Sequence, residues 1–368
     1  MKIAIVYPET LPSDKARTVT VVKTASTLGQ ISNITIVCGR SGSNIDDICD
    51  YYDVQKKFSL TQIPKKLLFK SNKIFNFFLI RYLRGAGYDS IYARHLKTAE
   101  ALIKSGFDVI FEAHEIFADS APKEKKEVVA ASERFVYENS KGVVFISETL
   151  KGEFETRFKL PSTIVLPLCF SEQVADADKK SFDELNEVYY IGSFQKWKGV
   201  DTLIKSAKYL PKNAKIKLVG SGGDEEALKK LASELGVEDT VEFLGRMPHA
   251  KVAELLKTKT KICVLPNNVS VFDKFTSPLK LFEYMASFNA VIASDMPSIK
   301  EITNGVALEF KAGDERDLGE KISYLLGNRE AARELAAASY AKISELEPDK
   351  RAIRLLEFMK SVNAKKAF

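Results

Sequence analysis

Residues 188–204 have the sequence VYYIGSFQKWKGVDTLI. An apolar run rich in β-branched and aromatic residues is followed by a turn that contains glycine, and then by an amphipathic stretch. This order predicts a strand, a turn and a helix, which together form part of a βαβ unit. Repeated units of this kind predict a parallel sheet with helices between its strands.

The same alternation of apolar runs and amphipathic stretches extends in both directions from this stretch. Many of the apolar runs lack polar alternation, which is typical of strands covered on both faces. The strands expected are residues 3–7, 34–38, 90–93, 109–112, 143–146 and 164–168 in the first half, and residues 188–193, 216–220, 241–245, 262–266, 291–295 and 306–310 in the second. The predicted fold class is therefore α/β, with two Rossmann-like doubly wound domains.

The length of 368 residues suits two domains, because domains commonly have roughly 100–200 residues. A boundary is expected where the run 164–168 gives way to the polar stretch 171–180. We therefore expect an N-terminal domain at 1–170 and a C-terminal domain at 171–349. Doubly wound sheets bind ligands just outside the carboxyl ends of their strands, so two such domains facing a central cleft predict a small-molecule enzyme.

Composition restricts the class of protein. Apolar residues make up 45% of the chain and charged residues 28%, with a net charge of +6, which is typical of a globular protein and does not by itself indicate nucleic acid. The first apolar run is too short for a signal peptide, and no run approaches the about 18 residues of a membrane span. The cysteines are scattered, at Cys38, Cys49, Cys169 and Cys263. Without paired spacing they indicate free thiols and a reducing cytoplasm.

Two glycine-containing turns follow strands in the second half. Lys198 stands directly before Gly199 where the predicted helix begins, so its ammonium can reach an anion at the helix N-terminus; a solvated loop lysine is the equal alternative. The turn Gly-Ser-Gly222-Gly223 lets backbone approach a ligand closely. It does not match the strict dinucleotide-binding pattern Gly-x-Gly-x-x-Gly, so it supports a nicotinamide cofactor only weakly.

The segment FTSPLKLFEYMASF, residues 275–288, predicts a helix. Thr276 or Ser277 can cap it and Pro278 suits its first turn, where free N–H groups could receive a diphosphate. Glu283 lies beside the apolar face of this helix, where an unpaired carboxylate is costly. Ribose hydroxyls would satisfy it, and so would a nearby Lys or Arg.

These motifs together resemble glycosyltransferase family 4, the retaining enzymes with the two-domain GT-B fold. The resemblance runs from Gly192 to Ile302 and includes five motifs in the right order and spacing. They are GSFxxWKGVD, LVGSG, VEFLGR, SPLKLFEYMA and VIASDMPSI. It implies the GT-B fold, with a helix at about 350–368 packing back on the N-terminal domain.

The resemblance also implies roles at matching positions. Lys198 would neutralise the donor diphosphate and act with His114 as a catalytic residue, and Glu283 would hold the ribose. The other donor-binding residues implied are Ser277, Pro278, Leu279 and Lys280 at the helix start, Ser193 and Gly222 in the two turns, and Gly245 and Arg246 near the base. Retaining enzymes of this fold act without a protein nucleophile, so positioning and stabilisation of the leaving diphosphate would carry the catalysis.

Several positions depart from the family pattern. The first glutamate of the family's Glu-x7-Glu motif falls at Phe275, and Asp273 is the nearest possible substitute. The arginine that often follows the glycine of the first motif is Ser193. Phe288 and Ala290 stand where Gly and Pro are usual. The parts that bind the diphosphate are therefore better preserved than the part that reads the sugar.

His114 is the histidine that the sequence places at a predicted strand end, in the stretch DVIFEAHE. In the resembling family a histidine at this position contacts the donor sugar near the reacting carbon, and the Glu-x-His pattern matches. The structural alternative is a histidine at the edge of the core that backbone groups satisfy. His95 and His249 are expected in loops or on the surface.

Residues 56–84 contain eight Lys and Arg residues and no Asp or Glu, interleaved with many aromatic and aliphatic residues. A helix of this composition suits the surface of an anionic membrane. The alternative is a core helix with a basic polar face. Membrane docking would fit a lipid-linked acceptor at the inner face of the cell membrane.

The function expected is transfer of a hexosyl or N-acetylhexosaminyl unit, with retention, from a UDP- or GDP-sugar to a hydroxyl of a glycan or lipid-linked acceptor. The setting would be surface glycan or glycolipid assembly. No metal is expected, because no Asp-x-Asp motif suited to a divalent ion stands at a strand end. No cofactor and no nucleic-acid partner are expected either. Two rivals remain: a nucleotide-sugar epimerase of the same fold, and a noncatalytic protein that binds nucleotide or nucleic acid.

Overall fold

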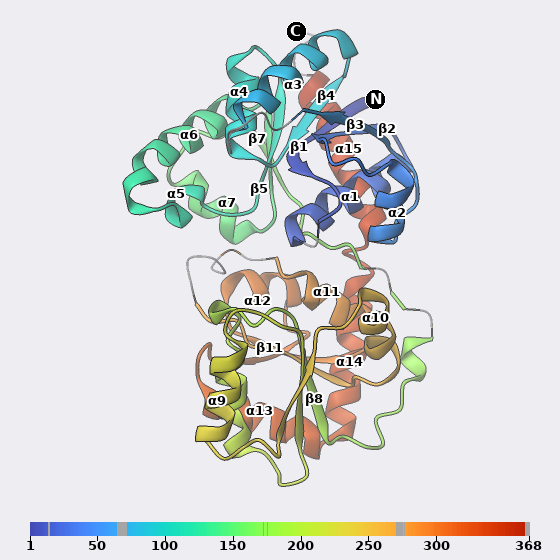
Figure 1. Ribbon diagram of the computed structural model, residues 1–368. Helices are drawn as coiled ribbons and strands as arrows, with labels where there is room; N and C mark the ends of the chain where they lie inside the picture. Colours follow the sequence, from blue (N-terminus) through green and yellow to red (C-terminus); the bar gives the residue numbers. More distant parts are fainter. Residues whose placement is uncertain are drawn as a thin grey trace. The chain divides into compact units, whose positions relative to one another are not determined.

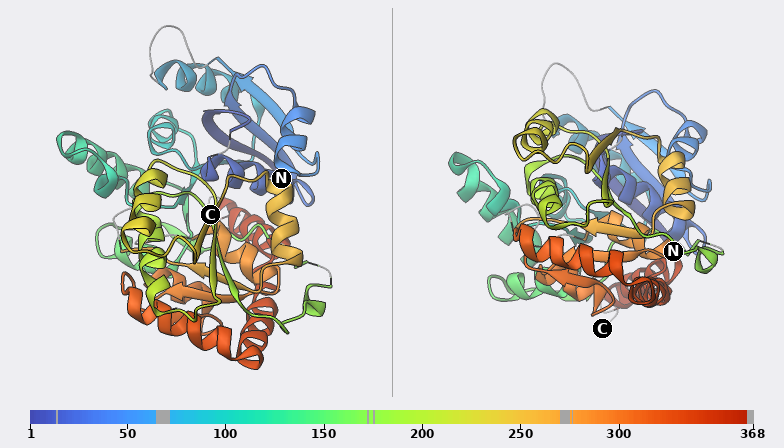
Figure 2. Two further views of the ribbon diagram at one scale, coloured as in Figure 1. Left: turned by 60° about the horizontal axis from the view of Figure 1, so that its bottom comes forward. Right: turned by 90° about the horizontal axis from the view of Figure 1, so that it is seen from below.

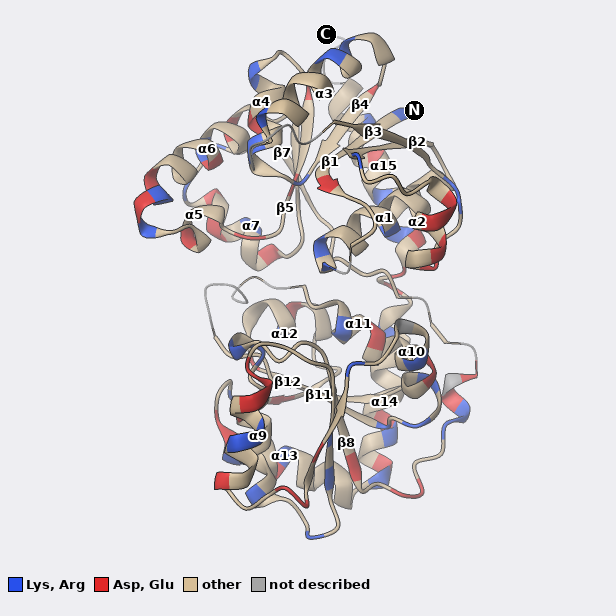
Figure 3. Cartoon of the chain, viewed as in Figure 1, with Lys and Arg blue, Asp and Glu red and all other residues tan. Residues whose placement is uncertain are grey.

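The computed structural model describes residues 1–13, 15–64, 72–171, 173–174, 176–269, 275 and 277–364. The chain forms two compact units (Figure 1). Residues 1–170 and the segment from Pro348 form the N-terminal unit, and residues 171–347 form the C-terminal unit. Lys, Arg, Asp and Glu are interspersed along the helices of both units, so the excess positive charge is spread out (Figure 3).

The N-terminal unit is built on a parallel sheet with the strand order β3-β2-β1-β4-β5-β6-β7. Its strands are β1 (Lys2–Thr10), β2 (Asn33–Gly39), β3 (Ser59–Ile63), β4 (Ser90–Ala93), β5 (Val109–Ala113), β6 (Gly142–Phe145) and β7 (Ser162–Val165). Its helices are α1 (Ala16–Gly29), α2 (Ile45–Tyr52), α3 (Lys73–Ala86), α4 (Leu96–Lys104), α5 (Phe117–Ser120), α6 (Lys126–Asn139), α7 (Glu148–Glu155) and α15 (Pro348–Ala364).

The C-terminal unit has a second parallel sheet, with the order β10-β9-β8-β11-β12-β13. Its strands are β8 (Glu187–Ile191), β9 (Lys215–Val219), β10 (Val241–Gly245), β11 (Ile262–Leu265), β12 (Ala290–Ser294) and β13 (Leu308–Phe310). Its helices are α8 (Val200–Ser206), α9 (Glu225–Glu234), α10 (His249–Thr258), α11 (Leu279–Ala286), α12 (Pro297–Thr303), α13 (Glu315–Gly327) and α14 (Arg329–Ile343).

Both sheets have the doubly wound order in which the chain starts in the middle and reverses direction once. Helices cover both faces of the C-terminal sheet (Figure 2). This arrangement explains why the strands have continuous apolar runs, since both of their faces are buried. The predicted α/β class with two Rossmann-like domains is confirmed.

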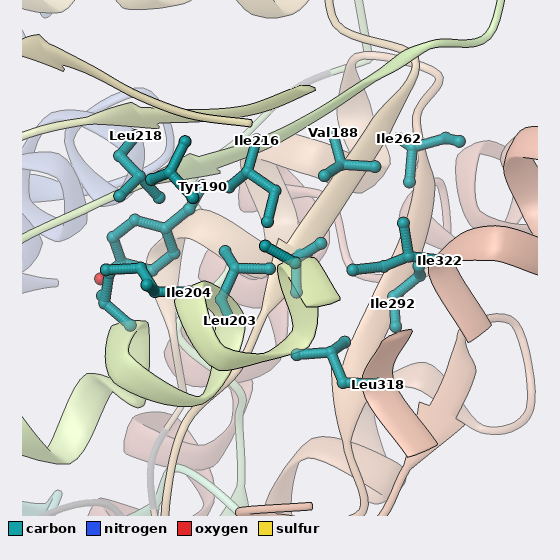
Figure 4. Close-up of a cluster of buried hydrophobic side chains, with 14 of the residues drawn as sticks. Val188, Tyr190, Leu203, Ile204, Ile216, Leu218, Ile262, Ile292, Leu318 and Ile322 are labelled. Carbon is teal, nitrogen blue, oxygen red and sulfur yellow. The ribbon is translucent and has the colours of Figure 1, made fainter. Parts of the chain in front are cut away.

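The core of the C-terminal unit joins alternate residues of the strands to the inner faces of α8 and α13 (Figure 4). Val188 and Tyr190 of β8 lie with Ile216 and Leu218 of β9 in this cluster, and all four are almost fully buried. Residues of this size each contribute about 1.5–3 kcal/mol when they are fully buried. The core thereby holds β8 and β9 rigidly up to their carboxyl ends.

Helix α15 returns from the C-terminal unit and packs against α1 of the N-terminal unit (Figure 1). Its Arg351 donates a hydrogen bond to Glu112 of β5 at 2.7 Å, and Arg94 lies 2.7 Å from the other oxygen of the same carboxylate. All three side chains are almost completely buried. A paired buried carboxylate of this kind joins the helix to the middle of the sheet.

The segment 56–84 differs from the expected basic helix. Residues 59–63 form strand β3 at the edge of the sheet, residues 65–71 lie outside the described residues, and α3 begins only at Lys73. Helix α3 buries Phe75, Leu79 and Leu83. No described helix is long and apolar enough to span a membrane.

Candidate functional site

The first part of the candidate site is the extension of β8. Gly192 N–H donates to Val219 O at 3.0 Å, and Phe194 N–H donates to Ser221 O at 3.0 Å, so the chain continues beside the turn after β9. A Cβ on Gly220, whose φ is 148°, would overlap the carbonyl oxygen of Gly192. These contacts show that Gly220 serves close packing of backbone on backbone, a use that the sequence interpretation of this turn did not foresee.

The turn that carries Lys198 lies between the ends of β8 and β11. Gly199 has a φ of 68°, and a Cβ there would overlap the carbonyl oxygen of Pro266, which directly follows β11. Asn268 N–H donates to Trp197 O at 3.0 Å. Lys198 is half-buried at the end of this turn, immediately before α8. The turn is therefore held by the loop after β11, at the point where the strand order reverses.

Helix α11 supplies the second part of the site. Pro278 is its N-cap, so Ser277 does not occupy the expected cap position; Thr276 lies outside the described residues. Ser277 is buried, while Leu279 and Lys280 are half-buried. The helix begins one residue later than expected, and Pro278 itself gives its first turn no side-chain hydrogen bond.

Glu283 is half-buried on α11 and forms an ion pair with Lys280, whose Nζ lies 2.5 Å from its Oε2. The sequence left a nearby Lys or Arg as the alternative partner for the Glu283 carboxylate, and Lys280 is such a partner. Phe275, in the place of the family's first glutamate, is buried, and Asp273 lies outside the described residues. Glu283 therefore lies beside an ammonium, and the position of the family's first glutamate holds an apolar side chain.

The remaining sequence-predicted residues of this unit follow other strand ends. Gly245 ends β10 with a φ of 68°, and its carbonyl accepts a hydrogen bond from Gly220 N–H at 2.9 Å. Arg246 follows and is exposed. Gly222 lies against Phe194, whose backbone nitrogen is 2.8 Å from a Cβ built on that glycine. Ser193 exposes its side chain, and its carbonyl accepts a hydrogen bond from the Tyr190 hydroxyl.

His114 belongs to the N-terminal unit, where it directly follows β5. Its Nε2 lies 3.4 Å from Glu115 Oε1, and its ring packs edge-on against Phe117. Its Nδ1 is buried and has no hydrogen-bond partner among the described residues. Burial raises the pKa of Glu115, but the hydrogen bond and charge of His114 outweigh that effect and hold the pKa below its ordinary value. The Glu115 side chain is therefore held as a carboxylate beside the imidazole ring.

Two contributors were missed by the sequence interpretation. Asn268 holds the Lys198 turn, and Tyr284, fully buried on α11, hydrogen-bonds to the backbone of β8. Asn268 could have been found, because residues just after a strand at the sheet's reversal point line the site. Phe288 has a left-handed backbone, with φ 53°, where the family usually has glycine. Its buried ring packs against Phe182 and Tyr340.

Within the described residues, no group of three or more His, Cys, Asp and Glu side chains is close enough to hold a metal ion. The four cysteines are buried free thiols. The turn after β8 instead carries the ammonium of Lys198, and the helix that follows β11 carries the carboxylate of Glu283. Such a set suits a ligand that combines anionic oxygens with hydroxyl groups.

Comparisons with known proteins agree with this chemistry. Residues 172–342 match the family of glycosyl transferases group 1. An uncharacterized glycosyltransferase of Haemophilus influenzae is 26% identical over 164 residues, which are 44% of either chain. The chain spans about half the length, or less, of the curated relatives that it matches.

Two solved structures resemble the whole fold. Sucrose-phosphate synthase from Thermosynechococcus elongatus has a TM-score of 0.79 at 18% identity, covering 99% of both chains. Alr3699/HepE of Anabaena, in complex with UDP, has a TM-score of 0.78 at 14% identity, covering 98% of this chain and all of that one. These likenesses show the GT-B fold. The segment that carries Lys198 and Glu283 lies within residues 172–342, which match the family of glycosyl transferases group 1.

Proposed function

We propose that this protein is a retaining glycosyltransferase of family 4 that moves a hexosyl or N-acetylhexosaminyl unit from a UDP- or GDP-sugar to a hydroxyl group. The observation that carries the proposal is that two elements are both fixed to the strands at the reversal point of the C-terminal sheet. The Lys198 turn is held there by the loop after β11, and α11, which begins after Pro278 and carries Glu283, is hydrogen-bonded through Tyr284 to the end of β8. The complex of HepE with UDP supports the choice of a nucleoside diphosphate.

Each element has a chemical role in the proposal. The Lys198 ammonium neutralises the diphosphate as the bond to the sugar breaks, and the first-turn N–H groups of α11 bind phosphate oxygens. Glu283 exchanges part of its contact with Lys280 for the ribose hydroxyls. His114 donates a hydrogen bond to the sugar near the reacting carbon. The diphosphate takes the acceptor's proton, so the reaction needs no protein nucleophile and no metal ion.

The donor site is tested by thermal unfolding and calorimetric titration with UDP, GDP and their hexose and N-acetylhexosamine conjugates. A ligand that binds only the folded state must raise the melting temperature. We expect either the UDP series or the GDP series to raise the melting temperature. Lys198→Met and Glu283→Gln should each weaken binding of that series at least tenfold. Lys205→Met is the matched control, because Lys205 forms only a half-exposed pair with Asp201 on α8.

The chemistry is tested by following release of the nucleoside diphosphate and the anomeric configuration of the product by NMR. We expect retention of the anomeric configuration. We also expect His114→Ala to lose turnover while its affinity for the donor stays within threefold of wild type. Inversion of configuration would rule out the proposed mechanism. Absence of binding to every nucleotide tested would remove the proposal as a whole.

A second part of the proposal concerns the acceptor, which we take to be lipid-linked. Helix α3 exposes Phe77 by 65% and Phe78 by 41%, and Arg81 and Arg84 are exposed on the same helix. Exposed aromatic rings beside basic groups suit the interface of an anionic membrane. The place of action proposed is the cytoplasmic face of the cell membrane, during assembly of a surface glycan or glycolipid.

Sedimentation with lipid vesicles tests this docking. Vesicles containing phosphatidylglycerol should bind the protein, and phosphatidylcholine vesicles should not. The double substitution Phe77→Ser/Phe78→Ser should weaken the binding at least fivefold. Val128→Ser is the control, because Val128 is 64% exposed on a different helix of the same unit. Equal binding by both variants would show that α3 is not the docking surface.

A further inference from the structure

Strands β8 and β11 separate before their carboxyl ends. β11 stays in register with β12 as far as Leu265↔Ala293, but its only pairing with β8 in the described chain is Cys263↔Tyr189. The residue after Leu265 is Pro266, which has no N–H to donate. The backbone of β8 beyond Tyr189 therefore lacks a strand partner on this side, and this is where the strand order reverses.

The Tyr284 hydroxyl takes the place of that missing strand partner. Gly192 N–H points toward β9, where it donates to Val219 O. Because backbone groups alternate in direction along a strand, the groups of Ile191 point the other way, toward β11. Ile191 N–H donates to the Tyr284 hydroxyl at 2.9 Å, and that hydroxyl donates to Ile191 O at 3.2 Å. One side chain thereby satisfies both backbone groups of a buried residue.

This pair of hydrogen bonds, here called the Tyr284 clamp, is rigid. Tyr284 is fully buried, and burial raises the pKa of its hydroxyl well above the ordinary value, so the group keeps the proton it donates. Its helix, α11, also carries Glu283 and the N-terminus that begins after Pro278. Ile191 in turn is the last residue of β8, from which the chain runs to the Lys198 turn.

We infer that Tyr284 is a positioning residue for the donor: it sets the spacing between the Lys198 turn and α11, so that one nucleoside diphosphate contacts both. This inference rests on the proposed function. The proposed donor-binding groups lie on the Lys198 turn and on α11. These two elements are far apart in the sequence, and no strand pairing in the part of the chain that the structure describes joins them. Among the hydrogen bonds of the described residues, the Tyr284 clamp joins α11 to the end of β8, from which the chain runs to the Lys198 turn.

The experiment is a double-mutant cycle on binding of UDP and GDP, measured by titration calorimetry. Tyr284→Phe removes the hydroxyl and keeps the buried ring. We expect it to weaken binding about tenfold, and Lys198→Met to weaken binding about tenfold in the wild-type background but less than threefold in the Tyr284→Phe background. Coupled residues depart from additivity in this way, while a general loss of stability leaves the two effects multiplicative.

Two controls separate positioning from folding. Tyr340→Phe removes a hydroxyl that donates to Val174 O at 2.8 Å in the same unit, and it should leave binding within twofold of wild type. p-Aminophenylalanine at position 284 retains a donor for Ile191 O and should restore binding to within threefold of wild type. This variant also provides the measurement if Tyr284→Phe does not fold.

The outcomes are distinguishable. Multiplicative losses, or a Tyr284→Phe variant that binds as tightly as wild type, would overturn the positioning role and leave the proposed function standing. Wild-type protein that binds neither UDP nor GDP would overturn the proposed function, and the positioning role would fall with it. Coupling between the two substitutions, with rescue by p-aminophenylalanine, supports the inference.

Discussion

Gly199 is the residue at which the Lys198 turn leaves no room for a side chain. Its φ of 68° is left-handed, and an added Cβ would overlap the carbonyl oxygen of Pro266. Gly199→Ala should therefore lower the free energy of unfolding by about 2–4 kcal/mol, of which the backbone conformation accounts for about 1 kcal/mol. It should also weaken UDP or GDP binding more than tenfold, because the turn must move. Thermal unfolding and calorimetric titration measure the two effects.

Gly236→Ala provides the control for this substitution. Gly236 has a similar φ of 64°, but a Cβ there meets nothing within 4 Å. The change should cost only about 1 kcal/mol of stability, with no effect on nucleotide binding. If both alanine variants behaved alike, the contact with Pro266 would have no importance for the site.

At the level of single residues, the sequence indicated candidate groups for binding anions and hydroxyls but not what holds those groups in place. Lys198 was proposed because a lysine before a glycine at a helix start has a recognisable local pattern. Tyr284 reads as one more core aromatic, since its hydrogen bonds reach a residue 93 positions away. Glu283 was proposed as well, although its pairing with Lys280 depends on rotamers that no sequence pattern reports.

Among the connecting segments, the stretch before β8 contains Lys180, whose ammonium is buried. Its Nζ donates to Leu256 O, Thr260 O and Ser287 O at 2.6–2.9 Å and lies 3.2 Å from Asn289 Oδ1. Leu256 and Ser287 lie at the carboxyl ends of α10 and α11, and Thr260 and Asn289 lie just before β11 and β12. Lys180→Met should leave buried carbonyl groups unsatisfied and lower the free energy of unfolding by about 2–4 kcal/mol, measured by urea denaturation.

Lys179→Met is the neighbouring control. Lys179 forms an exposed pair with Asp176, 2.6 Å away, and such pairs contribute about 0–1 kcal/mol. The Lys180 contacts lie at the amino ends of the strands, opposite the Lys198 turn. Nucleotide affinity should therefore stay within twofold in both variants, and a large loss of affinity in Lys180→Met would contradict this separation.

The sequence predicted the strands that are buried on both faces better than those at the edges. Runs such as the one ending at Cys38 are continuous and apolar, which leaves few alternatives to a central parallel strand. Strand β3 was missed because its sequence, SLTQI, has polar residues and only Ile63 is buried. The neighbouring basic residues suggested a helix from 56 onward, but a helical pattern is present only where Phe75, Leu79 and Leu83 recur.

On the scale of the whole molecule, a buried ionic group joins the two separate stretches of the N-terminal unit. Burial raises the pKa of Glu112, but the guanidinium groups of Arg94 and Arg351 outweigh it and hold the pKa at about 2. The carboxyl titrates near 4.5 in the unfolded chain, so folding favours its ionised form. This stabilisation, of the order of 3 kcal/mol, is complete above pH 4.5 and is lost as the pH falls toward 2.

Glu112→Gln should remove this acid dependence and destabilise the unit at neutral pH by about 3–5 kcal/mol, because two buried guanidinium groups lose their counter-charge. Unfolding followed between pH 2 and 7 tests the sign, and amide hydrogen exchange should show α15 exposed first. Glu138→Gln, at a surface pair with Arg134, should change the stability by less than about 0.5 kcal/mol. If the free energy of unfolding of Glu112→Gln fell with pH as steeply as that of wild type, the acid dependence could not be assigned to Glu112.

The return of α15 to the N-terminal unit has a consequence for how the protein is made. Arg351 is synthesised 239 residues after Glu112, which at about 5–20 residues per second takes roughly 12–48 s. During that interval α1 has no α15 to cover it, whereas residues 171–347 are contiguous and can complete their own sheet as they leave the ribosome. The unit that is begun first is therefore finished last, and the surface of α1 that α15 covers stays open to water until the end of synthesis.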